Sequence, residues 1–116
     1  MAVRFKGPLL DVDLCALGDI APNTGLGAWA AGRQVATFKI NDALYAISNR
    51  DPFSGTARLS RGRVSERFGR AIVTAPDSAQ DFDLRTGECL TDPSVRIPVY
   101  RVRKLDGRVV ISVPRP

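Results

Sequence analysis

Short runs in which hydrophobic and polar residues alternate fill most of the chain, and this period of two predicts β-strands. The clearest run is Arg33–Ile40, which continues after Asn41-Asp42 into a second run, Ala43–Ser48. Two such runs joined by a short polar turn predict a β-hairpin. Further strands are predicted at Asp11–Leu17, Arg70–Ala75, Asp81–Leu84, Cys89–Leu90, Val95–Arg103 and Arg108–Val113.

The segments between these runs are rich in turn residues. Asp106-Gly107 is a strong hairpin turn, and Arg50–Gly69 is a long polar stretch that is predicted to be a functional loop or to carry short structure of its own. No segment keeps a helical period over three turns. The pattern predicts an all-β fold, a sandwich or partly closed barrel. Its expected core is Leu14, Ile20, Val35, Phe38, Tyr45, Ile47, Val73, Phe82, Leu84, Val99, Val109 and Ile111.

The composition is that of an ordinary globular protein. The chain has 116 residues, of which 44% are hydrophobic and 25% charged, so we expect a single domain, residues 1–116, with a real core. No apolar run has the length of a membrane span, and Met1 to Lys6 lack the apolar core of an export signal. We therefore expect a cytoplasmic protein with no membrane partner.

The two cysteines predict no zinc site. Cys15 and Cys89 have no C-x-x-C spacing, and the chain contains no histidine to complement them or to act as a base for a thiolate nucleophile. A disulfide between them remains open from sequence alone. Two reduced, partly buried thiols are the usual arrangement in a cytosolic chain.

The net charge of +5 comes mainly from arginine. Arginine is enriched at protein interfaces, whereas a basic patch is also compatible with nucleic acid or with a simply solvated loop. Single-strand binders stack bases on aromatic side chains along a basic groove, and Phe68 is the one aromatic residue inside the densest cluster. That cluster, relieved in sequence only by Glu66, consists of Arg58, Arg61, Arg63, Arg67 and Arg70.

Two loops in the middle of the chain carry the most informative motif. Asn49-Arg50-Asp51-Pro52-Phe53-Ser54-Gly55 is followed downstream by Ala75-Pro76-Asp77-Ser78, which runs into Phe82-Asp83-Leu84-Arg85-Thr86-Gly87. This layout resembles a Rieske domain, in which two Cys and two His from two proline-containing loops hold a [2Fe–2S] cluster. The ligand positions here hold Asp51, Phe53, Ala75 and Ser78, so the resemblance implies the Rieske-like scaffold without its metal cluster.

One branch of that superfamily is especially similar, the small subunits of assimilatory NAD(P)H-dependent nitrite reductase. In that branch Asp and Phe stand where the first Cys and His would be, as in Asn49–Gly55 here. Similarity continues through Gly18-Asp19-Ile20, Gln34–Phe38, Leu59–Gly62, Phe82–Leu90 and Asp106–Val109. The second loop departs from the branch, because Asp77-Ser78-Ala79 replaces bulkier residues.

The resemblance implies a non-catalytic subunit with no cofactor of its own. Its partner would be the nitrite reductase large subunit, an oxidoreductase that carries FAD, an iron–sulfur cluster and sirohaem and reduces nitrite to ammonia in nitrate assimilation. The expected partner contacts are Arg50, Phe53, Arg61 and Asp77. Phe53 either anchors the partner or fills the space left by the cluster, and Asp51 either contacts the partner or, as we favour, accepts N–H bonds within its own turn.

Three other functions remain as alternatives. The chain resembles an orphan Rieske-like interaction module equally well if no large subunit accompanies it. A basic nucleic-acid-binding barrel is the second alternative. An independent enzyme is the third, for which Asp81 and Asp83, on one strand face, are the only paired carboxylates that we single out; such pairs are more often solvated surface.

Overall fold

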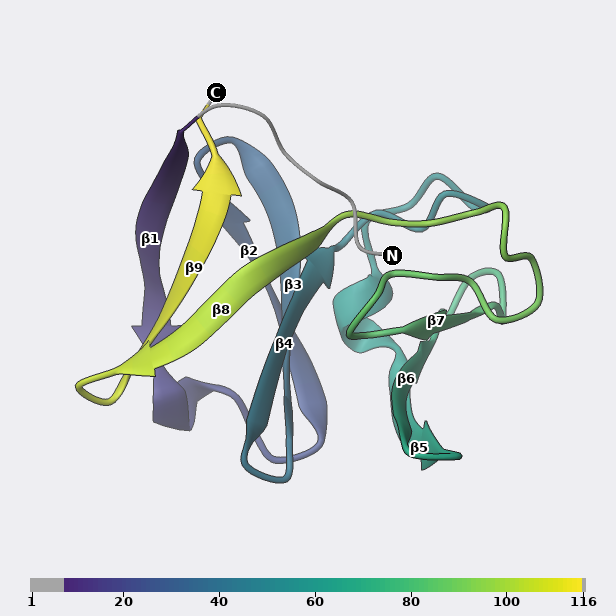
Figure 1. Ribbon diagram of the computed structural model, residues 1–116, viewed down its shortest axis with the longest axis horizontal. Coiled ribbons are helices and arrows are strands. Elements are labelled where there is room, and N and C mark those ends of the chain that lie inside the picture. Colours follow the sequence, from purple (N-terminus) through teal and green to yellow (C-terminus); the bar gives the residue numbers. More distant parts are fainter. Residues whose placement is uncertain (1–7, 116) are drawn as a thin grey trace.

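The fold is built from strands, as the alternating pattern predicts. A computed structural model describes residues 8–115, and in this range it contains two short 3-10 turns and no α-helix (Figure 1). No helix in residues 8–115 reaches the length and apolar character that crossing a membrane requires. The elements are β1 Leu9–Ala16, η1 Leu17–Asp19, β2 Thr24–Ala30, β3 Arg33–Ile40, β4 Ala43–Ser48, η2 Leu59–Arg61, β5 Arg63–Arg67, β6 Arg70–Thr74, β7 Asp81–Asp83, β8 Val99–Leu105 and β9 Arg108–Pro114.

The strands form two antiparallel sheets. The larger has the order β1-β9-β8-β4-β3-β2 and curls into an open half-barrel, whereas β5, β6 and β7 form a separate small sheet beside it (Figure 1). The small sheet and its loops are inserted between β4 and β8. The predicted class, an all-β Rieske-like fold with small antiparallel sheets and a partly closed barrel, is confirmed.

Local turn chemistry accounts for the hairpins. The β3–β4 hairpin has the predicted bounds, and Asn41 in its turn takes φ of 52°. The Asp106-Gly107 turn places both residues at positive φ, which the type I′ turn of a two-residue hairpin requires. Ala31-Gly32 and Phe68-Gly69 adopt the same backbone between β2 and β3 and between β5 and β6.

The prediction was incomplete in four places. No strand was predicted at β2, and the expected strand Cys89–Leu90 contributes only an isolated bridge between Cys89 and Phe82. The expected long loop Arg50–Gly69 contains η2 and the whole of β5, whose arginine-rich sequence hides its alternation. The expected strand Val95–Arg103 begins only at Val99. Upstream of Pro98 the chain folds against the Gly87 turn, where the Ile97 N–H donates to the Gly87 carbonyl at 2.9 Å, and the Ile97 side chain joins the core.

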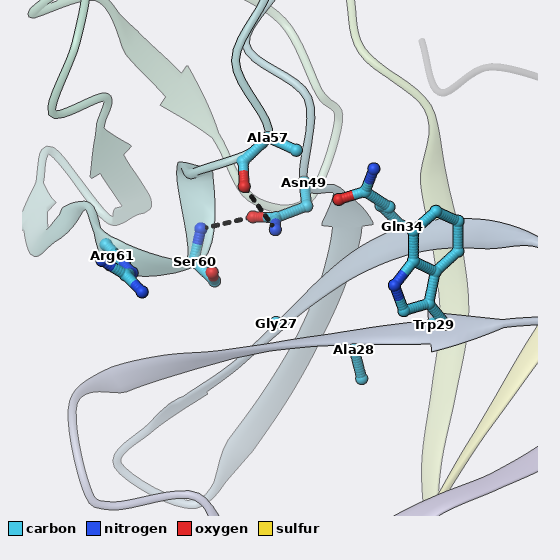
Figure 2. Close-up of a pocket in the computed structure, with 8 residues that line it drawn as sticks. All are labelled: Gly27, Ala28, Trp29, Gln34, Asn49, Ala57, Ser60 and Arg61. Carbon is cyan, nitrogen blue, oxygen red and sulfur yellow. Dashed lines mark hydrogen bonds between the residues drawn. The ribbon is translucent and has the colours of Figure 1, made fainter.

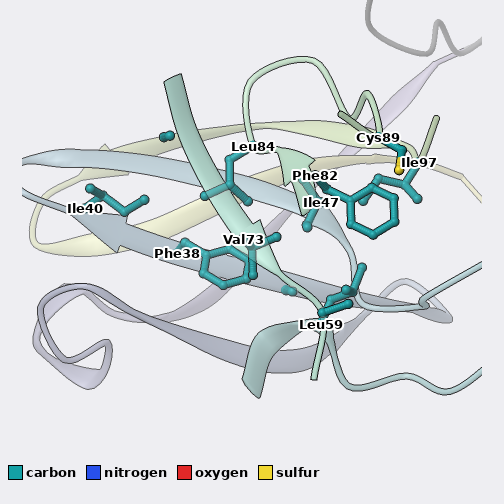
Figure 3. Packing of buried hydrophobic residues seen from close by; sticks show 12 residues of the cluster. Phe38, Ile40, Ile47, Leu59, Val73, Phe82, Leu84, Cys89 and Ile97 are labelled. Atoms are coloured by element: carbon teal, nitrogen blue, oxygen red, sulfur yellow. The ribbon is translucent and has the colours of Figure 1, made fainter. Parts of the chain in front are cut away.

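The main core lies between the two sheets. Phe38 and Ile47 from the large sheet face Val73 and Phe82 from the small one, with Leu59 closing the side (Figure 3). All five side chains are fully buried. Most of the predicted core is confirmed, although Leu14, Tyr45 and Val99 are only partly buried, and the importance of Leu59 is not evident from its polar neighbours in sequence.

A second apolar region fills the concave side of the curled sheet. Val35 and Ala46 pack there with Ile111 and Val113, next to a smaller group around Ile20 and Val109. Cys15 belongs to this smaller group, and Cys89 belongs to the core between the sheets. Both cysteines are free and buried, so the two-thiol alternative is confirmed over the disulfide.

Gly87 provides a test of how tightly the insertion is packed. A Cβ there would lie 2.1 Å from the Ile97 carbonyl oxygen, and φ is +79°. Gly32 has nearly the same φ, +80°, with open space around it. We expect Gly32→Ala to lower the free energy of unfolding by about 1 kcal/mol through backbone strain alone, and Gly87→Ala by about 1–3 kcal/mol more through overpacking. Urea denaturation of both variants measures the difference, and equal losses would show that the Gly87 turn can move away from Ile97.

Candidate functional site

The two loops predicted from the motif lie side by side at one end of the small sheet. The first follows β4 and contains Asp51 and Phe53, and the second follows β6 and contains Ala75 and Ser78. A direct bond joins them, because the Thr56 hydroxyl donates to the Asp77 carboxylate at 2.6 Å. Arg58 forms an ion pair with the same carboxylate at 3.4 Å. The four degenerate ligand positions therefore belong to one structural unit.

The two loops are closed by the same pair of backbone hydrogen bonds. In the first, the Asp51 N–H donates to the Thr56 carbonyl and the Gly55 N–H donates back to the Asp51 carbonyl, both at 2.8 Å. In the second, Ala75 donates to Gln80 at 2.8 Å and Ala79 to Ala75 at 2.9 Å. Gly55 and Ala79, at equivalent positions, both take positive φ.

A third turn of this kind explains what Asp51 does. At Asp83 the backbone bonds with Gly87 and Glu88 recur, and the Asp83 carboxylate also accepts the Arg85 N–H at 2.7 Å. Asp51 does the same, accepting the Phe53 N–H at 2.9 Å. A short acidic side chain that accepts an N–H two residues on is a common way to stabilise a turn. Asp51 thus occupies the ligand position as a turn-forming residue, as expected from its type.

The Asp51 carboxylate is held ionised in a buried place. Asp51 is only 1% exposed, and its Oδ2 atom has no partner of normal hydrogen-bond geometry within residues 8–115. Burial by itself raises the pKa of the Asp51 carboxyl. Hydrogen bonding from the nearby Ser78 hydroxyl, and from the Phe53 and Ser54 N–H groups, outweighs burial and leaves the pKa below its usual value of 3.8.

Phe53 is packed on one side and exposed on the other. Its ring centre lies 6.1 Å from that of the buried Phe82, at an interplanar angle of 47°, which is within the range of a favourable aromatic pair. The side chain nevertheless stays 44% exposed. Pro52 and Pro76 beside it are also exposed. We call these three residues, Pro52, Phe53 and Pro76, the tip.

The residues at the ligand positions do not fit an iron–sulfur cluster. Phe53 and Ala75 have no donor atom, and Asp51 is committed to its own turn. Ser78 alone offers a hydroxyl. Within residues 8–115 no three His, Cys, Asp or Glu side chains come together in a way that could hold a metal ion.

The four expected partner contacts are distributed over two surfaces. Phe53 lies at the tip, and Asp77 lies next to it but is engaged by Thr56 and Arg58. Arg50 and Arg61 are exposed and have no ion pair within residues 8–115. They line two neighbouring hollows on the side of the molecule where β2 meets η2.

The hollow that Arg61 lines is a polar groove of about 270 Å³ that the sequence did not suggest (Figure 2). Its most prominent member is Trp29, which is 68% exposed although tryptophan is usually buried. An isolated tryptophan between small residues could have drawn attention to this place. The lining residues are Gly27, Ala28, Trp29, Gln34, Asn49, Ala57, Ser60 and Arg61.

The remaining arginines of the cluster are largely neutralised by acids distant in sequence. Arg67 pairs with Asp81, and Arg70 lies 3.8 Å from both Asp83 and Glu88. The Thr74 hydroxyl also donates to Asp81 at 2.5 Å, and hydrogen bonds from Thr74 and Arg67 overcome the effect of burial to lower the pKa of Asp81. The Asp81 and Asp83 carboxylates are thus used in structure. Three arginines of the cluster are paired with acids, whereas Arg61 and Arg63 have no ion pair within residues 8–115.

The ionised state of Asp51 predicts a pH dependence. Because its folded pKa lies below 3.8, its contribution to stability is present above that value and is lost as pH falls through the folded pKa. At pH 7, Asp51→Asn should lower the free energy of unfolding, measured by urea denaturation, by about 1 kcal/mol. Below about pH 3 the free energies of unfolding of the variant and the natural chain should converge. Asp42→Asn, at an exposed position, is the matched control and should change stability by less than about 0.5 kcal/mol. A constant difference between pH 7 and pH 3 would contradict the role of the Asp51 charge.

Comparison with known proteins agrees with this geometry. Residues 12–112 match the family model described as the Rieske-like [2Fe-2S] domain. The nitrite reductase (NADH) small subunit of Escherichia coli K12 is 39% identical over 99 residues, covering 84% of this chain and 92% of that protein. The solution structure of the nitrite reductase [NAD(P)H] small subunit from Erwinia carotovora superimposes with a TM-score of 0.78 at 36% identity, covering 91% of this chain and 83% of that one.

A third relative is much longer. The nitrite reductase [NAD(P)H] large subunit of Klebsiella oxytoca is 32% identical over 99 residues, which cover 85% of this chain but only 10% of that protein. The same domain therefore occurs both as a separate chain and as part of a large subunit. Together with the Asp51–Phe53 loop and the curled sheet, these matches show that the chain belongs to the Rieske-like family and, within it, to the small subunits of NADH nitrite reductase.

Proposed function

We propose that this chain is a non-catalytic auxiliary subunit that binds the large subunit of an NAD(P)H-dependent nitrite reductase. The large subunit, with FAD, an iron–sulfur cluster and sirohaem, would reduce nitrite to ammonia in assimilation. The observation that carries the proposal is the Klebsiella oxytoca large subunit, in which an equivalent domain is covalently part of the enzyme. A domain that is fused in one relative and separate in another is expected to occupy the same place in both.

The local chemistry supports an auxiliary role. The chain has no histidine, and its former ligand positions fit no cluster, so it would carry no electrons itself. Asp81, the best-placed carboxylate for an independent enzyme, is bonded to Thr74 and Arg67. What the protein retains is a single Rieske-like domain, residues 1–116 in our proposal, that presents two rigid loops.

The tip is the surface that we assign to docking. Its loops are closed by backbone bonds and joined through Thr56 and Asp77, so little conformational freedom would be lost on binding. Phe53 is exposed enough to enter a pocket on the partner while Phe82 fixes its ring from behind. Asp77 lies next to this anchor, and Arg50 and Arg61, on the neighbouring surface where β2 meets η2, complete the proposed contacts. Aromatic anchors and arginines are both enriched at protein interfaces.

The first experiment is co-purification of the tagged chain with the nitrite reductase large subunit from the same organism, with iron analysis of each component. We expect a complex whose nitrite-dependent NAD(P)H oxidation is faster than that of the large subunit alone, and an iron content that belongs entirely to the large subunit. A large subunit that is fully active alone and does not retain this chain would overturn the proposal. Iron bound to the isolated chain would refute the cluster-free role.

Substitution at the tip tests the docking surface. Phe53→Ala should weaken the complex about tenfold or more, because aromatic anchors contribute disproportionately to interfaces. Phe68→Ala is the matched control, since Phe68 is fully exposed on the β5–β6 turn, outside the tip. Isothermal titration of both variants with the large subunit measures the affinities. Equal affinity of Phe53→Ala and the natural chain would remove the tip from the interface.

A further inference from the structure

The groove beside Trp29 adjoins a close contact between β2 and the η2 turn that two glycines permit. Gly25, Gly27 and Trp29 alternate along β2 and point to the same face of the sheet. At Gly25 and Gly27 the η2 turn approaches so closely that a Cβ would lie 2.6 Å from the Ser60 carbonyl oxygen and 2.8 Å from Ser60 Oγ, respectively. At Trp29 the two elements have separated. The indole therefore stands across an open space from Ser60 and Arg61 (Figure 2).

The groups around this space can still bind a ligand. Within residues 8–115, the side chains of Trp29, Gln34, Ser60 and Arg61 have no hydrogen-bond or ion-pair partner. Asn49, by contrast, is buried and satisfied, because its amide donates to the Ala57 carbonyl at 3.0 Å and its Oδ1 accepts the Ser60 N–H at 2.7 Å. Asn49 thus fixes the base of the groove, and the unpartnered side chains around it offer hydrogen-bond donors to a ligand.

The charge around the groove has a single sign. A second hollow shares Trp29 and Gln34 with the groove and adds Arg33, Ser48 and Arg50. The linings of the two hollows together contain three arginines and no carboxylate. Six arginines outside the hollows form ion pairs within residues 8–115, as Arg67 does with Asp81, whereas Arg50 and Arg61 form none. An acidic ligand would complement this surface.

The neighbouring sheet edge favours an extended ligand. β2 is the last strand of the large sheet, and no strand within residues 8–115 pairs with its outer side. Natural edge strands usually carry charges, prolines or bulges that prevent further pairing. β1, at the opposite edge, has a bulge and the ion-paired Asp11 and Asp13, whereas β2 has no charged residue, no proline and an unbroken register with β3.

We propose that the Trp29 groove binds an extended acidic segment of the large subunit, as a second contact in addition to the tip. An apolar part of the segment would lie on the indole, and a carboxylate would face Arg61. The inference rests on the proposed function, since it names how the same partner is recognised. It adds Trp29 to the expected contacts Arg61 and Arg50, which line the groove and the neighbouring hollow.

The single tryptophan of the chain makes the groove directly observable. Chain labelled with 15N-tryptophan has one indole N–H signal, and unlabelled large subunit adds none. We expect this signal to move to a new position in the complex, in the natural chain and also in Phe53→Ala at saturating large subunit. An indole signal that broadens with the size of the complex but keeps its position would overturn the groove as a contact.

Affinity measurements separate the groove from the proposed function. Trp29→Ala and Arg61→Glu should each weaken binding of the large subunit about tenfold. Lys104→Glu, at an exposed position outside both hollows, should change it less than about twofold. Because Trp29 is mostly exposed, the folded state should survive its removal, which urea denaturation checks. If the natural chain does not bind, the proposed function fails; if it binds and both groove variants bind equally well, only this inference fails.

Discussion

The bond between the Asp51 carboxylate and the Phe53 N–H is the interaction on which the former ligand loops depend. In a Rieske domain a metal cluster links the two loops. Here each loop must hold its own shape, and a carboxylate that forms the turn supplies what a metal ligand no longer does. The same carboxylate-to-N–H bond forms at Asp83, which is not a ligand position, so this way of closing a turn does not depend on the ligand loops. The Thr56–Asp77 hydrogen bond then replaces the link between the loops.

The loops are also fixed from below by the core. Phe82 is buried against Phe38, Ile47 and Val73, and Phe53 lies on its outer side. The apolar contact between the sheets therefore reaches the surface at the tip. Aromatic packing and turn hydrogen bonds, rather than metal coordination, hold the small sheet on the large one.

Sequence predicted what depends on neighbouring residues and missed what depends on distant ones. The bounds of β3 and β4 and the Asp106-Gly107 turn follow from local alternation and turn chemistry. The turn role of Asp51 was expected for the same reason. β5 was missed because its arginines mask the alternation of apolar and polar residues, and its pairing with β6 is not visible in its own sequence. The groove was missed because it requires Ser60 to approach Gly27, a contact between segments 33 residues apart, which the spacing of the two positions along the chain does not reveal.

Asn49 connects the two surfaces to which we assign partner contacts. It directly follows β4, two residues before Asp51, and its side chain bonds both Ala57 and Ser60. Its backbone carbonyl also accepts the Leu59 N–H at 3.1 Å, which places Leu59 in the core. The buried Asn49 amide thus helps to fix the position of the tip and the position of the Ser60 wall of the Trp29 groove. A partner that engages both surfaces would meet them at a fixed separation, so recognition depends on their relative position as well as on the chemistry of each.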